Sequence, residues 1–114
     1  MRIEIQAKRM PALNEIREHV RHRLQFALGR FAHGVSTVRV YLSDVNGPRG
    51  GSDKFCRIVV QLKQHSRVVI QDLGHDMRQV VDRVADRVHQ SVSRQLGRMH
   101  RVQRLALAMP PDAV

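Results

Sequence analysis

DMRQVVDRVADRVHQSVSRQLGRMHR, residues 76–101, places apolar side chains three and four positions apart along most of its length. At about 100° per residue, this spacing brings them onto one face of an α-helix. That face holds Met77, Val81, Val84, Val88, Val92 and Met99, with Val80 and Leu96 at its edges. The segment therefore predicts a long helix that packs one side against a core.

The same segment carries a row of arginines on a second face. The row consists of Arg83, Arg87, Arg94, Arg98 and Arg101. These residues fall within a sector of about 60° and extend about 27 Å along the axis. Asp82 and Asp86 lie to one side, and no acid follows until Asp112. We interpret the helix as a candidate polyanion-binding rod; the alternative is a solvated charged face.

The composition of the whole chain agrees with a polyanionic partner. Its 114 residues include 20 Lys+Arg and 10 Asp+Glu, for a formal net charge of +10. Such a balance points toward nucleic acid, an anionic membrane surface or an acidic protein. Aromatic residues are scarce, and binders of unpaired strands usually carry aromatic platforms for the bases. We therefore expect recognition of structured nucleic acid through its backbone and shape.

A single cysteine, Cys56, excludes an internal disulfide and fits a reducing cytosol. The N-terminus has no apolar segment typical of a signal peptide, and no apolar run approaches the roughly 20 residues of a membrane span. We expect a soluble protein of the cytoplasm with no membrane partner. Cys56 falls on the inward side of a predicted strand, which favours a small buried apolar residue over a nucleophile.

Alternation and helical spacing divide the rest of the chain into elements. Strands are predicted at residues 2–6, 35–43, 56–63 and 67–72, and a first helix at 13–31. The order predicts an α+β domain, β-α-β-β-β-α, with a four-stranded antiparallel sheet and two helices on one face. We expect one domain over residues 1–101 and a fraying tail at 102–114. Arg17 and Arg21 lie one turn apart on the polar side of the first helix.

The segment DVNGPRGGSDK, residues 44–54, is too long for a two-residue hairpin turn. Its G-x-x-G at 47–50 lies between predicted strands, whereas the clamp of KH domains joins two helices. A phosphate-binding loop ending in Gly-Lys-Ser/Thr is absent from it. Two interpretations remain: a plain connection, or a glycine-rich backbone on which Arg49 and Lys54 add phosphate contacts.

Catalytic and metal-binding patterns are poor. His19 and His22 form an H-x-x-H pair without a nearby cysteine or third ligand, so surface histidines are favoured over a metal site. Asp72 and Asp76 flank the start of the last helix, where Asp76 is expected to cap the N-terminus. We expect no catalytic residue, no metal, no cofactor and no small-molecule substrate.

Several short motifs occur in a telling order: a start of the form M-x-I-x-I, EIREHV at 15–20 and HDM at 75–77. Over about residues 1–101 the chain resembles the family of hibernation-promoting factors and ribosome-associated inhibitors. The resemblance implies a domain similar to the double-stranded-RNA-binding fold. It implies docking on the bacterial small ribosomal subunit and its RNA, in the messenger and transfer RNA channel, so that idle ribosomes are silenced. The family's contacts are basic residues of both helices, which match Arg17, Arg21, Arg83, Arg87, Arg94 and Arg98 here.

The chain also departs from this family. Arg78 stands where an aromatic often follows the D-M pair, and the 44–54 segment is longer than the usual turn. The C-terminal dimerisation domain of the long forms is not present in this sequence, so we do not expect the chain's own tail to pair ribosomes. We expect the protein to be a monomer. The alternatives are a regulatory module that binds an acidic protein, and a domain that binds non-ribosomal structured RNA. An RNA-cleaving enzyme is the least favoured. Arg39, Arg57 and Lys63 form a second basic set, expected on the open sheet face.

Overall fold

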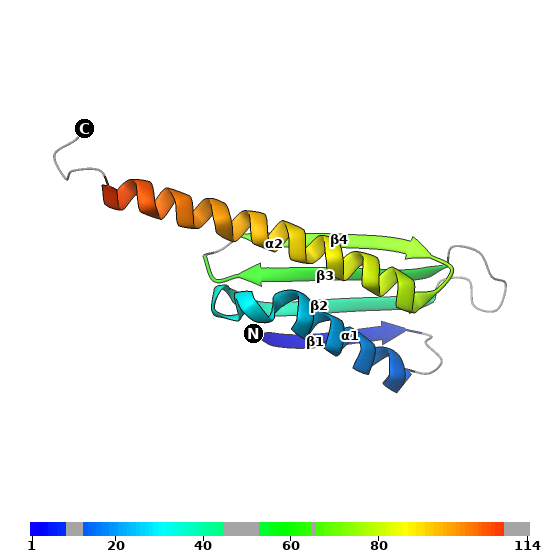
Figure 1. Ribbon diagram of the computed structural model, residues 1–114. Helices are drawn as coiled ribbons and strands as arrows, with labels where there is room; N and C mark the ends of the chain where they lie inside the picture. Colours follow the sequence, from blue (N-terminus) through cyan, green and yellow to red (C-terminus); the bar gives the residue numbers. More distant parts are fainter. Residues whose placement is uncertain (9–12, 45–52, 65, 109–114) are drawn as a thin grey trace.

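The computed structural model describes residues 1–8, 13–44, 53–64 and 66–108. The elements are β1 (Arg2–Lys8), α1 (Leu13–Leu28), the 3₁₀-helix η1 (Gly29–Gly34), β2 (Val35–Asp44), β3 (Lys54–Leu62), β4 (Arg67–Gly74) and α2 (Met77–Ala108). Both α-helices lie across the same face of one four-stranded sheet (Figure 1). The predicted β-α-β-β-β-α order is confirmed.

The strands lie in the order β1-β2-β3-β4, so the first and the last strand form the two edges of the sheet. β2, β3 and β4 are antiparallel, but β1 pairs with β2 in parallel, with Ile3 opposite Val38 and Ile5 opposite Val40. The predicted all-antiparallel sheet is therefore wrong, and the sheet is mixed. The cause is α1: a helix that crosses the sheet returns the chain to the end where β1 began, so β2 must run the same way as β1.

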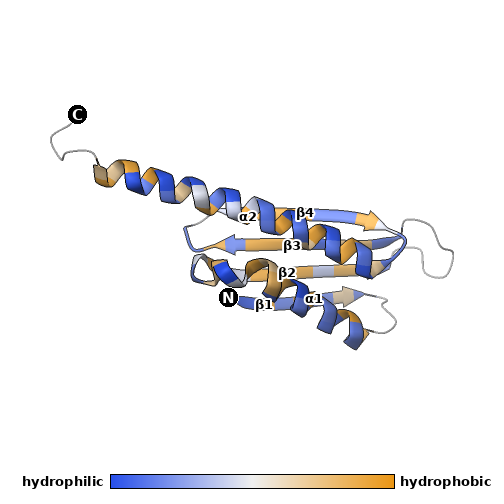
Figure 2. Ribbon diagram, in the orientation of Figure 1, coloured by the Kyte–Doolittle hydropathy of each residue, from blue (hydrophilic) through white to orange (hydrophobic). Residues whose placement is uncertain are grey.

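One face of the sheet and the inner sides of both helices form the core. The predicted inward residues of the central strands are buried, among them Val40 and Ile58. From α1 come Ile16, Val20, Leu24, Ala27 and Leu28, and from α2 come Met77, Val80, Val81, Val84, Val88 and Val92. Figure 2 shows this distribution as apolar residues along the central strands and alternating polar and apolar positions along the helices. Each valine, leucine, isoleucine or methionine among them contributes about 1.5–3 kcal/mol when fully buried.

The first helix ends at Leu28, three residues before the predicted 31, and the chain continues as η1. Gly34 closes η1 in a narrow space, because a Cβ there would lie 3.2 Å from a methyl group of Leu96. His89 of α2 contacts this region, with Nδ1 2.7 Å from the carbonyl oxygen of Ala27 and its ring 5.6 Å from that of Phe31. These contacts join the end of α1 to the middle of α2.

The last helix is longer than predicted. Asp76 caps it as expected: its Oδ1 accepts a hydrogen bond from the backbone N–H of Arg78 at 2.9 Å. The far end reaches Ala108, so residues 102–108, which we assigned to a tail, are helical. Residues 101–108 are all exposed, and this end of α2 extends past the sheet (Figure 1).

Candidate nucleic-acid interface

The N-terminal part of the arginine row is turned toward β4. Nε of Arg83 donates to Oδ2 of Asp72 at 3.0 Å, and its Nη2 donates to the carbonyl oxygen of Leu73 at 3.2 Å. Nη1 of Arg87 donates to the carbonyl oxygen of Gln71 at 3.5 Å. The hydrogen bond from Arg83, followed by that from the Leu73 backbone N–H, lowers the pKa of Asp72. This half of the row is therefore committed to the sheet edge, although both guanidinium groups remain exposed.

The C-terminal part of the row differs in its surroundings. Arg94, Arg98, Arg101 and Arg104 are exposed, and within the described part of the chain none of them forms an ion pair with a carboxylate. Helix α2 contains no acid between Asp86 and its end at Ala108. Arg94 and Arg98 line a shallow hollow together with Ser91 and Gln95. Over about 15 Å of helix, positive charge is thus concentrated without neutralisation by the described residues.

Arg104 is a member that the sequence interpretation missed, because residues 102–114 were assigned to a tail. A signal was available in VQRLALA, residues 102–108. Leucine, arginine, glutamine and alanine are strong helix formers, and the first proline after them is Pro110. Arg104 lies three residues beyond Arg101 and is rotated about 60° from it around the helix, so it extends the row at its edge.

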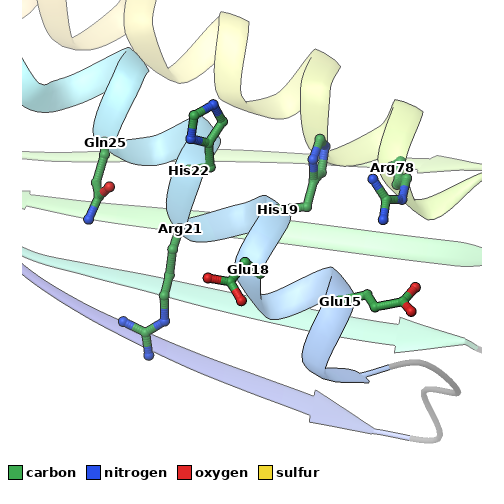
Figure 3. A pocket seen from close by; sticks show the side chains of 7 residues that line it. All are labelled: Glu15, Glu18, His19, Arg21, His22, Gln25 and Arg78. Carbon is green, nitrogen blue, oxygen red and sulfur yellow. The ribbon is translucent and has the colours of Figure 1, made fainter.

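The arginines of α1 lie on a different side of the molecule. His19 and Arg23 face α2, and Arg17 and Arg21 each precede one of them by two residues, a rotation of about 200°. Figure 3 shows Arg21 directed away from α2, near Glu18. Nε of Arg17 is buried without a hydrogen-bond partner among the described residues. Arg17 and Arg21 therefore occupy the outer flank of α1, on the β1 side.

The space between the two helices is filled by a charged network. Nε2 of His19 lies 2.8 Å from Oδ1 of Asp82, and Nη2 of Arg23 donates to Oδ1 of Asp86 at 2.7 Å. Nε of Arg23 is 3.1 Å from Oδ1 of Asp82, close enough for an ion pair but not aligned for a hydrogen bond. The two acids of α2 thus separate the two arginine sets. The expectation of one basic surface shared by both helices is wrong, and two separate basic flanks take its place.

The glycine-rich segment contributes less than expected. Nζ of Lys54 lies 2.8 Å from Oδ2 of Asp44 and 3.4 Å from Oδ2 of Asp53. Both carboxylates are buried, and the hydrogen bond to Asp44 is the main cause of the raised pKa of Lys54. Because these two acids hold the ammonium group of Lys54, the lysine is not available as a free phosphate contact. Arg49 lies outside the described residues.

The structure also shows the surroundings of the cysteine and of the histidine pair that the sequence singled out. Cys56 is buried, as expected, and burial together with the charge of Asp72 raises the pKa of its thiol to about 12. The predicted H-x-x-H pair is divided: His19 contacts Asp82, whereas His22 is exposed beside the hollow of Figure 3. In the described ranges, no three His, Cys, Asp or Glu side chains are grouped to hold a metal ion. Nor is any helix there long and apolar enough for a membrane span.

Residues 3–100 match the family described as "Sigma 54 modulation protein / S30EA ribosomal protein". No match was found among curated proteins. The N-terminal domain of Protein Y from Thermus thermophilus is 24% identical, with a TM-score of 0.67, over 82% of this chain and 98% of that chain. A ribosomal subunit interface protein from Coxiella burnetii is 18% identical, with a TM-score of 0.68, over 85% of this chain and 99% of that chain. At these identities, the two structures show a shared fold.

Proposed function

Because the chain belongs to the sigma 54 modulation protein / S30EA ribosomal protein family, we propose that it binds the small ribosomal subunit and keeps idle ribosomes out of translation. The family is ribosome-associated and regulatory, and it is not a family of enzymes. In the proposal the protein acts as a monomer in the bacterial cytoplasm. It occupies the channel for messenger and transfer RNAs and inhibits by competing with them, so no chemical step is needed.

The observation that carries the proposal is the unneutralised half of the α2 row. Arg94, Arg98, Arg101 and Arg104 are exposed, follow one another along the helix and have no carboxylate partner among the described residues. Guanidinium groups suit phosphate oxygens because they offer several N–H donors in one plane. Arg17 and Arg21 supply a second basic flank across α1, so the RNA would contact the helical layer on both sides. Arg83 and Arg87 would contribute their charge more than their hydrogen bonds, which β4 already receives.

The salt dependence follows from counterion release. If the four α2 arginines, Arg17 and Arg21 each meet a phosphate, affinity should fall about a thousandfold between roughly 50 and 200 mM salt. A protein partner held by apolar contacts would lose much less. Binding measured across this range therefore distinguishes the two kinds of interface.

The direct test is co-sedimentation with small ribosomal subunits through sucrose. The variant is Arg94→Glu with Arg98→Glu, and the matched control is Arg30→Glu with Arg78→Glu, which also lowers the net charge from +10 to +6. All four side chains are exposed, so both proteins should keep the wild-type circular dichroism spectrum. We expect the α2 variant to disappear from the subunit fraction and the control to remain. Equal sedimentation of the α2 variant and wild type would refute binding through this row.

A module that binds an acidic protein is a second candidate. Val102, Leu105 and Leu107 are all exposed on the last turns of α2, beside Arg101 and Arg104. Apolar residues flanked by cations suit an apolar groove with an acidic rim. This candidate would be favoured if the chain recovers one protein from a ribosome-free extract and the Leu105→Asp variant does not.

A further inference from the structure

The face of the sheet opposite the helices is not covered by any described element (Figure 1). Side chains alternate along each strand, so the residues between the buried positions point to this face. They are Glu4, Gln6 and Lys8 of β1, Thr37, Arg39, Tyr41 and Ser43 of β2, Phe55, Arg57, Val59 and Gln61 of β3, and Arg67, Val69, Gln71 and Leu73 of β4, together with Arg2. We call this set the open sheet face. Lys63 was expected on this face but does not lie there. It lines a hollow on the helix side together with Leu96 and Met99.

Two of the chain's four aromatic residues lie on the open sheet face, on its two central strands and toward the end where β2 finishes and β3 begins. Tyr41 is opposite Arg57, and Ser43 is opposite Phe55. Tyr41 and Phe55 are therefore diagonal neighbours on adjacent strands, about 7–8 Å apart between Cα atoms. Leu73, which is 49% exposed, lies opposite Phe55. Two rings and an aliphatic side chain thus occupy neighbouring positions of the open sheet face, which the low aromatic content of the chain did not predict. We call these three residues the apolar platform.

Cations share the open sheet face with this platform, and Arg57 lies directly opposite Tyr41. The open sheet face carries Arg2, Lys8, Arg39, Arg57 and Arg67. The one acid in this set, Glu4, is already 3.2 Å from Nε of Arg2 and 3.3 Å from Nε of Arg39. Arg57 is exposed and, among the residues that the structure describes, forms no ion pair. Since a second copy would bring like charges together on this face, the charge favours a polyanionic occupant.

We infer that the open sheet face binds an unpaired RNA strand. Successive bases stack on Tyr41 and Phe55, and the phosphates on either side meet Arg57 and Arg39. Stacking on aromatic rings within a basic groove is how unpaired strands are held without sequence preference. The site is separate from α2, which faces structured RNA in the proposed function, so either surface can be correct without the other.

The test measures fluorescence anisotropy of a labelled oligouridylate of about 12 nucleotides on addition of the full chain. Tyr41→Leu removes the ring but keeps an apolar residue, and we expect it to weaken binding at least about fivefold. Tyr41→Phe keeps the ring and should bind like wild type. Arg57→Gln, at an exposed position, should lower the slope of log affinity against log salt by about 0.7, the value for one phosphate contact with a single strand. Arg94→Glu with Arg98→Glu serves as the variant of the other surface.

The outcomes divide clearly. Weaker binding in Tyr41→Leu, restored in Tyr41→Phe, with a lower salt slope in Arg57→Gln, supports the site. Three results would overturn it: no binding of the oligouridylate by the wild-type chain; binding abolished in the α2 variant but unchanged in Tyr41→Leu and Arg57→Gln; or a dimer in sedimentation equilibrium that Val69→Glu dissociates. The last result would assign the face to a second copy of the chain. None of the three depends on whether the protein binds ribosomal subunits.

Discussion

Nε of Arg83 lies 3.0 Å from Oδ2 of Asp72, and this contact joins the first arginine of the α2 row to the edge strand β4. It divides the row by function as well as by position. Arg83 and Arg87 hold α2 on the edge strand, whereas the arginines from Arg94 onward have no carboxylate partner among the described residues. The free part is the part we assign to RNA.

The contact has a defined pH dependence. The pKa of Asp72 in the folded chain is below its ordinary value of 3.8, so folding favours the ionised carboxylate. The stabilisation is present above the unfolded pKa and is lost as pH falls through the folded pKa. Because the side chain is 32% exposed, we expect only about 0.2–1 kcal/mol. Urea denaturation should show Asp72→Asn less stable than wild type at neutral pH, with the difference vanishing well below pH 3.8. Arg83→Gln should follow the same profile, and a difference that persists in acid would contradict the assignment.

Gly74 is required where β4 meets α2. A Cβ at this position would lie 2.6 Å from Cγ2 of Val80 and 2.8 Å from Nη2 of Arg83. Val80 is fully buried and cannot yield, so Gly74→Ala should reduce the free energy of unfolding by about 1–3 kcal/mol. The matched control is Gly97→Ala, because nothing lies within 4 Å of a Cβ there. That variant should be as stable as wild type or more so, since alanine favours helix by about 1 kcal/mol over glycine. Similar losses in both variants would show that the close contact at Gly74 is not the cause.

Cys56 should be unreactive in the folded protein. Its pKa of about 12 leaves almost no thiolate at a pH of about 8, and the side chain is buried. A disulfide reagent such as dithionitrobenzoate should therefore react slowly with the native chain and at once with the urea-unfolded chain. Rapid reaction of the native protein would show that the strand opens locally and would remove the basis for calling the thiol inert.

The protruding end of α2 should be dispensable for stability but not for binding. A chain ending after Arg101 loses residues of which 102–108 are all exposed, so its free energy of unfolding should stay within about 0.5 kcal/mol of wild type. Leu24→Ala in the core should cost about 2–5 kcal/mol in the same urea titration. Without Arg104, binding to small subunits should weaken. The slope of log affinity against log salt should decrease in magnitude by about 0.7–0.9, the value for one phosphate contact. Unchanged binding would remove Arg104 from the interface.

Local pattern predicted most of the fold. The inward residues of the strands, the buried face of α2 and the cap at Asp76 were all expected, because strand alternation and helical spacing are set by backbone geometry alone. The parallel pairing of β1 could have been inferred from the intervening helix, and the length of α2 from the absence of a breaker before Pro110. These were errors of interpretation rather than limits of the sequence.

The contacts among the charged residues could not be predicted from local pattern. Asp82 and Arg23 are 59 positions apart, and their contact depends on which sides of two helices meet across the sheet. A helical wheel gives the angle of Arg17 around α1 but not the direction of α2. Lys54 was likewise assigned to RNA because the burial of Asp44 and Asp53 beside it cannot be read from spacing. Helical spacing identified the exposed arginines of α2, but it did not show how the arginines of the two helices group into surfaces.

The bonds from Arg83 and Arg87 to the Leu73 and Gln71 carbonyls have a consequence beyond the anchoring of α2. β4 has a neighbour on one side only, and an edge strand with vacant carbonyls is a template on which another polypeptide can add a strand. Here two of the acceptors are occupied by guanidinium groups, which also repel an approaching copy of this cationic chain. Strand addition by another copy of the chain is thereby disfavoured along this part of the edge.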